Sequence, residues 1–276
     1  MRTAGPEFLV IGAMKAGTTA LYHLLAQHPQ IGMSRMKETD YFVAEKNLPL
    51  GPRWYAAQFP PAPCRGEVSP NYSKDDIFPG VAARVAASLP DARLIVLLRD
   101  PVARFAAHYR HAWSTGNMAV RPDALLRSPA GRHMLATSRY TERLAPWRAV
   151  FADERLLVLC FEDLVAAPQA AMHPVWSHLG LEPFATRPPA VRNEAASVAA
   201  VPASIQRLWR RRALRRLDPL IGQSLRRAAR RVFSRAPQRQ VPPLPDAVLR
   251  EVAQRLAPDA ARLRLETGNA FPEWQI

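Results

Sequence analysis

Residues 10–21 read VIGAMKAGTTAL, an apolar run that passes into a loop containing glycine, lysine and threonine. Gly12 and Gly17 have the glycine spacing of a Walker A phosphate-binding loop, in which a lysine follows the second glycine. Thr18 occupies that position here, and Lys15 lies inside the loop instead. Backbone amides at the start of the following helix can still bind a phosphate. The stretch predicts a nucleotide-binding loop whose lysine reaches the bridging oxygen of a leaving group and supplies charge without a metal.

The rest of the chain alternates between apolar runs typical of buried strands and runs typical of helices. Asp100 and Pro101 fit the N-cap and the first position of one such helix. The strands are expected at residues 8–11, 30–34, 65–69, 92–98 and 154–161, and the main helices at 18–27, 79–89, from 101 onward and at 169–180. The pattern predicts an α/β, P-loop-containing nucleotide-binding fold with a central parallel sheet flanked by helices on both faces.

The chain is long enough for one large domain, since it has 276 residues and is 48% hydrophobic. We expect a single domain over residues 1–276, whose last part, 241–268, forms two short helices ending at Gly268. The longest apolar runs have the length of buried strands, and the N-terminus lacks a signal-peptide pattern. Two cysteines and seven histidines without ligand spacing predict neither a disulfide framework nor a metal site. A cytoplasmic protein is the expectation.

The net charge of +15 is concentrated in one segment. Only four of the 38 basic residues are lysines, whereas residues 207–239 contain twelve arginines and a single acid. This arginine-rich segment, at about 202–240, has a helical apolar stripe opposite its arginines. It either packs on the body with solvated arginines or lies on an anionic membrane at its inner face. It lacks the interleaved aromatic residues of single-strand binders, so no nucleic-acid partner is expected.

Two motifs together resemble the sulfotransferases that use 3′-phosphoadenosine-5′-phosphosulfate (PAPS). IGAMKAGTTAL, from residue 11, is similar to their 5′-phosphosulfate loop, and LIVLLRDPVARFAAHY, from residue 94, to their strand–Arg-Asp-Pro–helix signature. KETDYF, GEVSPNY, RYTERLAPW and FEDL also match the family pattern. The resemblance covers roughly residues 7–182 and, more weakly, 241–274. It is closest to the glycan-type branch, which includes heparan sulfate sulfotransferase domains and bacterial relatives.

The resemblance implies a site in which PAPS donates its sulfuryl group in line and leaves as 3′-phosphoadenosine-5′-phosphate (PAP). Glu38 would be the base that deprotonates the acceptor, and Lys15 would stabilise the departing phosphate. Arg99 would bind the 3′-phosphate, and Arg239 or Arg235 would belong to a basic loop that closes over the nucleotide. The implied cofactor-binding residues are Lys15, Ala16, Gly17, Thr18, Thr19, Arg99 and Arg239.

The chain departs from the family pattern at three positions. Ala107 replaces a serine that binds the 3′-phosphate, which leaves His108 or Arg104 to compensate, although Arg104 can equally be a charge on the helix surface. Val68 stands where heparan-type relatives have a lysine after the glutamate of the third strand. Asp40 takes a position where glycan-type relatives often have histidine, and it is a second candidate carboxylate.

The main alternative is a P-loop small-molecule kinase, which accounts for the glycines but not for Lys15 or the Arg-Asp-Pro junction. The acceptor is expected to be a carbohydrate, glycolipid or secondary metabolite that offers a hydroxyl or an amine. Tyr140 is a candidate for lining the acceptor cleft. The sequence pattern does not choose among these acceptors, because acceptor clefts are built from loops.

Overall fold

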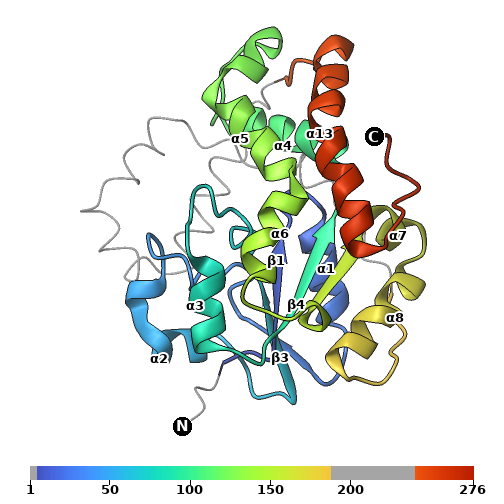
Figure 1. The fold of residues 1–276 in the computed structure, drawn as a ribbon. Helices are drawn as coiled ribbons and strands as arrows, with labels where there is room; N and C mark the ends of the chain where they lie inside the picture. Colours follow the sequence, from blue (N-terminus) through green and yellow to red (C-terminus); the bar gives the residue numbers. More distant parts are fainter. Residues whose placement is uncertain (1–4, 188–239) are drawn as a thin grey trace. The chain divides into compact units, whose positions relative to one another are not determined.

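The computed structural model describes residues 5–187 and 240–276 (Figure 1). These residues form two compact units. The first contains residues 5–105, 135–187 and 250–276, and the second contains 106–134 and 240–249. Nearly all of the arginine-rich segment, with Arg239, lies outside the described residues, so its helix and its roles stay predictions. The single domain also stays a prediction.

Five parallel strands form the sheet of the first unit, which confirms the expected α/β class. Their spatial order is β2-β3-β1-β4-β5, with β1 at the centre between β3 and β4. The strands are β1 (Phe8–Gly12), β2 (Ile31–Met33), β3 (Cys64–Val68), β4 (Arg93–Leu98) and β5 (Leu156–Cys160). Since all strands run the same way, their carboxyl ends meet at one edge, where open α/β sheets bind their ligands.

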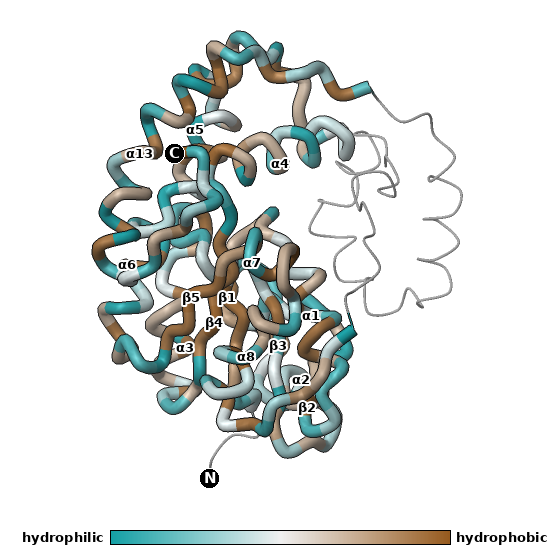
Figure 2. The backbone as a smooth tube through the Cα atoms, turned by 90° about the vertical axis from the view of Figure 1, so that its right-hand side faces the viewer, coloured by the Kyte–Doolittle hydropathy of each residue, from teal (hydrophilic) through white to brown (hydrophobic). Residues whose placement is uncertain are grey.

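The sheet is covered on both faces, because alternate residues of a strand point to opposite sides. Leu9 and Ile11 of β1 pack with α3 (Val81–Ser88), α6 (Tyr140–Arg148) and the later part of α13 (Asp246–Thr267). Phe8 and Val10 pack with α1 (Thr18–Leu25) and α8 (Pro168–Leu179). The mainly hydrophobic colour of β1 and β4 in Figure 2 shows why these central strands need cover on both sides.

The remaining helices connect these layers. They are η1 (Leu48–Leu50), α2 (Gly51–Ala56), α4 (Pro101–Ser114), η2 (Pro122–Arg127), α5 (Pro129–Ser138), η3 (Asp153–Arg155) and α7 (Phe161–Ala166). The Asp100 cap is confirmed, because its Oδ1 accepts a hydrogen bond of 2.7 Å from the amide of Ala103. No described helix has an apolar stretch long enough to cross a membrane.

In the second unit, residues 240–242 are held to the later half of α4. Tyr109 donates its hydroxyl to the carbonyl of Pro242 over 3.0 Å, and Trp113 donates its indole N–H to that of Gln240 over 2.9 Å. Ala107 lies on this part of α4. Its predicted effect on the 3′-phosphate site stays a prediction.

The expectation of two short C-terminal helices is wrong, because α13 runs without a break from Asp246 to Thr267. Pro258 lies inside it and removes one helical hydrogen bond. Val252, Leu256 and Leu263 are buried on one side of the helix. We infer that their burial offsets the lost bond. Gly268 ends the helix as expected, with a left-handed φ of 68°.

Candidate active site

The loop between β1 and α1 has the backbone shape of an anion-binding site. Lys15 has a φ of 67° and Gly17 a φ of 90°, and left-handed residues of this kind turn successive amides toward one point. Gly17 is the N-cap of α1, and no side chain caps this helix among the described residues. Its first-turn amides are therefore available to an anion at the positive end of the helix dipole.

Phe161 joins the loop to the predicted 3′-phosphate ligand. A Cβ placed on Gly17 would lie 2.4 Å from the Phe161 ring, so only glycine allows this contact. The guanidinium carbon of Arg99 lies 4.8 Å from the centroid of the same ring, in a cation–π contact. The Nε atom of Arg99 is buried and has no hydrogen-bond partner among the described residues. An oxyanion beside it would supply that missing partner.

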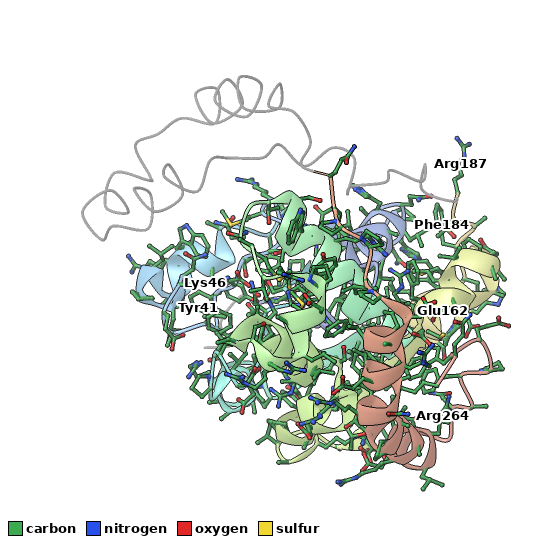
Figure 3. The ribbon with its side chains drawn as sticks, turned by 90° about the horizontal axis from the view of Figure 1, so that it is seen from above. Tyr41, Lys46, Glu162, Phe184, Arg187 and Arg264 are labelled. Atoms are coloured by element: carbon green, nitrogen blue, oxygen red, sulfur yellow. The ribbon has the colours of Figure 1, made fainter. Side chains whose placement is uncertain are left out.

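The backbone around Arg99 is fixed by several hydrogen bonds. Tyr140 is buried and donates its hydroxyl to the Arg99 carbonyl over 2.8 Å, which assigns Tyr140 to support of Arg99 rather than to an acceptor cleft. Glu162, labelled in Figure 3, accepts from the amide of Asp100 (3.1 Å) and the indole of Trp274 (3.2 Å). The sequence signal for this support is the FEDL motif, which contains both Phe161 and Glu162.

Glu38 follows β2 and is tied to the loop by a neighbouring lysine. The Lys37 ammonium donates to the Thr19 hydroxyl over 2.6 Å and to a Glu38 carboxylate oxygen over 3.1 Å. The Glu38 side chain stays 45% exposed, as a base that meets an incoming acceptor must be. Sequence reasoning did not single out Lys37. The contact places the predicted base beside the predicted phosphate loop.

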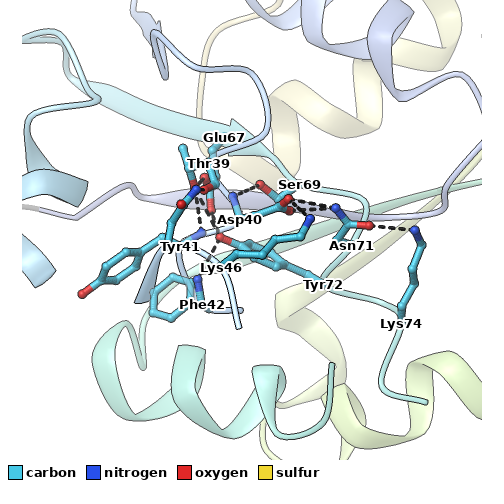
Figure 4. Close-up of polar contacts among 11 residues, drawn as sticks. Thr39, Asp40, Tyr41, Phe42, Lys46, Glu67, Ser69, Asn71, Tyr72 and Lys74 are labelled. Carbon is cyan, nitrogen blue, oxygen red and sulfur yellow. Dashed lines mark hydrogen bonds and ion pairs between the residues drawn. The ribbon is translucent and has the colours of Figure 1, made fainter. Parts of the chain in front are cut away.

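A buried hydroxyl network fixes the residue after Glu38 (Figure 4). Glu67 on β3 accepts hydrogen bonds from Thr39, from Tyr55 at 3.0 Å and from Tyr72 at 2.6 Å. Burial raises the pKa of Glu67 to about 7, although the three hydroxyl donors lower it. This network holds Thr39 and thereby the backbone of the adjacent Glu38.

Asp40 is engaged by its own partners. Its carboxylate forms an ion pair with Lys46 and accepts from the Asn71 amide at 3.1 and 2.8 Å. Its backbone has a φ of 47° and donates to the Ser69 hydroxyl over 3.2 Å. Asp40 therefore anchors the Glu38 loop, whereas Glu38 alone of these two carboxylates is exposed to an acceptor.

The chain has only four lysines, and all of them belong to the loops of this site. Lys15 lies in the phosphate loop, Lys37 contacts Thr19, Lys46 pairs with Asp40, and Lys74 donates to Asn71 over 2.7 Å. Elsewhere the basic residues are all arginines. A lysine differs from an arginine in presenting a compact charge with three donors, and it can bind a phosphate as a point charge.

Arg104 is not a helix-surface charge, because it is fully buried. Its Nε donates to the Ser138 hydroxyl over 2.8 Å, and its Nη1 donates to the carbonyl of Met14 over 3.3 Å. It therefore braces the phosphate loop from α4, next to Lys15. Among the sequence-predicted residues, the structure brings Lys15, Ala16, Gly17, Thr18 and Thr19 together with Arg99 and Glu38.

Glu67→Gln is expected to change how stability depends on pH. Because the folded-state pKa is raised from 4.5 to about 7, the folded protein keeps a proton that the unfolded chain loses in that range. The free energy of unfolding should therefore fall as pH rises from 4.5 to 7, by about 3 kcal/mol at most. Urea unfolding at pH 5, 6, 7 and 8 should show a flatter profile for Glu67→Gln. The control Glu182→Gln, at an exposed acid, should keep the wild-type slope; parallel profiles for all three proteins would contradict the assignment.

Comparison with known proteins agrees with this geometry. A model of the sulfotransferase family matches residues 79–186, which include the Arg99 turn and Phe161. Human bifunctional heparan sulfate N-deacetylase/N-sulfotransferase 2 is 28% identical over 202 residues, covering 65% of this chain and 22% of that protein. Mouse heparan sulfate glucosamine 3-O-sulfotransferase 3B1 is 28% identical over 197 residues, covering 66% of this chain and 47% of that protein.

A solved structure supports the fold. The crystal structure of a sulfotransferase from Alicyclobacillus acidocaldarius matches with a TM-score of 0.68 at 20% identity, covering 98% of this chain and 99% of that one. These comparisons show that the chain resembles sulfotransferases over part of its length, and they favour sulfuryl transfer over the kinase alternative. The chain spans only 22% of the length of the N-deacetylase/N-sulfotransferase relative. In the described part of the chain, no group of three or more His, Cys, Asp or Glu side chains is placed to hold a metal ion.

Proposed function

We propose that this protein transfers a sulfuryl group from PAPS to a hydroxyl or amine of an acceptor. The observation that carries the proposal is the Phe161 ring, which packs against Gly17 of the phosphate loop and under Arg99. One ring thus sets the spacing between an anion-binding helix start and an arginine whose buried Nε has no hydrogen-bond partner in the described part of the chain. A nucleotide with phosphates at both its 5′ and 3′ positions fits two such sites.

Each residue then has a defined part in an in-line displacement. The loop amides and Lys15 hold the 5′-phosphosulfate, and Arg99 binds the 3′-phosphate. Glu38 takes the proton from the acceptor as the acceptor oxygen or nitrogen bonds to sulfur. The bond from sulfur to the bridging phosphate oxygen breaks, and Lys15 stabilises the charge that develops there. PAP and the sulfated acceptor are the products.

The acceptor belongs to the glycans, glycolipids or small secondary metabolites. Two relatives are named for heparan sulfate, which favours a carbohydrate, and the exposed Glu38 suits a hydroxyl or an amine. A cytoplasmic location and contact with an anionic membrane through the arginine-rich segment belong to the same proposal. Contact with an anionic membrane would bring the site to acceptors held at the membrane surface.

Nucleotide binding tests the proposal without knowledge of the acceptor. Calorimetry in EDTA should show PAP binding about 10- to 100-fold more tightly than adenosine 5′-phosphate, because only PAP has the 3′-phosphate that reaches Arg99. Arg99→Gln should reduce PAP affinity to that of adenosine 5′-phosphate. The variant Arg121→Gln, at an exposed arginine, is the charge control and should bind PAP normally. Equal affinity of the wild type for the two nucleotides would contradict the proposal.

A further inference from the structure

Lys74 is a buried ammonium group that forms no ion pair with a carboxylate of the described residues. The residue is only 7% exposed, and none of the ion pairs among the described residues includes it. Its Nζ donates over 2.7 Å to the side-chain oxygen of Asn71, which is a neutral acceptor. A buried charge needs a compensating charge or several hydrogen bonds, and a lysine has three donors to satisfy. An oxyanion beside Lys74 would supply both.

Lys74 lies between the phosphate loop and Glu38, the predicted base. Ser73, the preceding residue, donates its amide to the Ile11 carbonyl over 3.1 Å, and its hydroxyl would lie 2.5 Å from a Cβ on Gly12. This packing fastens the Lys74 segment to the first residues of the loop. On the other side, Asn71 links Lys74 to Asp40, in the loop that carries Glu38 (Figure 4).

The electrostatic surroundings agree with this placement. Burial, together with the charges of Lys46 and Arg104, lowers the pKa of Lys74 to about 8, against the opposite effect of the Asp40 and Glu38 charges. Both Glu38 and Arg104, which holds the Met14 carbonyl of the loop, are thus close enough to act on Lys74. In sulfuryl transfer from PAPS, the sulfonate group lies between the base and the phosphate-binding loop.

We propose that Lys74 binds the oxygens of the sulfonate group of PAPS and follows it through transfer, as a catalytic residue of the proposed reaction. This assignment rests on the proposed function. Heparan-type relatives have a lysine after the glutamate of the third strand, and this chain has Val68 there. Lys74 would supply the cation that Val68 does not. Lys74 lies in the turn that follows β3, six residues after Val68.

The test compares two nucleotides that differ only by the sulfonate. Calorimetry with the full chain measures the dissociation constants of PAP and PAPS for the wild type, Lys74→Met and Arg262→Met. Lys74→Met should weaken PAPS binding about 10- to 100-fold, the usual effect of losing a charged donor, and should leave PAP binding within about 2-fold. Arg262→Met removes one charge from an exposed pair on α13 and should bind both nucleotides as the wild type does.

The pH dependence provides a second readout that a merely structural lysine would not give. As pH rises above about 8, Lys74 loses its proton, so the PAPS affinity of the wild type should fall more steeply than its PAP affinity. Lys74→Met should lack this difference. Equal loss of PAP and PAPS affinity in Lys74→Met, or no loss of either, would overturn the role of Lys74. Failure of the wild type to bind PAP would instead overturn the proposed function.

Discussion

Glu38→Gln should lower the rate of sulfuryl transfer by about 10²- to 10⁴-fold, the usual effect of losing a general base. Its affinity for PAP should change by less than about 2-fold, because a glutamine keeps the shape and removes only the proton acceptor. The separation of rate from binding follows from the position of Glu38, which is exposed beside the loop and held by Lys37 rather than placed within the nucleotide-binding amides.

The rate is measured as transfer of labelled sulfate from PAPS to acceptors in a host extract, and PAP affinity by calorimetry. Glu45→Gln changes an exposed acid of the same loop and is the matched control, which should retain the wild-type rate. A Glu38→Gln protein that transfers sulfate at a near-normal rate would assign the base to another residue.

Lys15→Ala should damage both binding and rate. Lys15 lies inside the anion-binding loop, at a left-handed residue before Gly17, so its charge acts on the phosphate in the ground state and on the leaving oxygen during transfer. We expect a loss of about 10²- to 10³-fold in rate and about 10-fold or more in PAP affinity. Lys15→Ala should change the free energy of unfolding little, because Arg104 holds the loop backbone independently through the Met14 carbonyl.

The control for this variant is Arg35→Ala, which removes an exposed cation from the segment after β2. It should leave PAP affinity and rate unchanged. If Lys15→Ala binds PAP normally and transfers sulfate at the wild-type rate, the displaced lysine of the loop has no part in the reaction.

The sequence predicted the features that depend on local pattern. The parallel sheet, the loop at residues 12–18 and the Asp100 cap each follow from neighbouring residues, and the structure has all three. The expectation of two short helices was wrong because one continuous helix is stabilised by a tertiary feature, the buried face that includes Val252 and Leu263.

The supporting residues of the site were not predictable from spacing, because their partners are distant in the chain. Lys37 contacts Thr19, 18 residues away, and Arg104 contacts Met14, 90 residues away. One signal was present in the composition: lysine is rare in this arginine-rich chain, and each of its four lysines belongs to the site. The structure was needed to assign each of them a neighbour.

We expect PAPS to be the donor in a transfer that needs Lys15 and Glu38. The most direct measurement adds PAPS labelled in its sulfonate to a host extract with the purified protein, in EDTA, and follows the label into acceptor molecules. We expect label to enter an acceptor with stoichiometric release of PAP. Glu38→Gln should abolish most of this transfer, and ATP labelled in its γ-phosphate should transfer no label. Transfer of the γ-phosphate in the presence of Mg²⁺, with no transfer of sulfate from PAPS, would show that the protein is a kinase and that PAPS is not its donor.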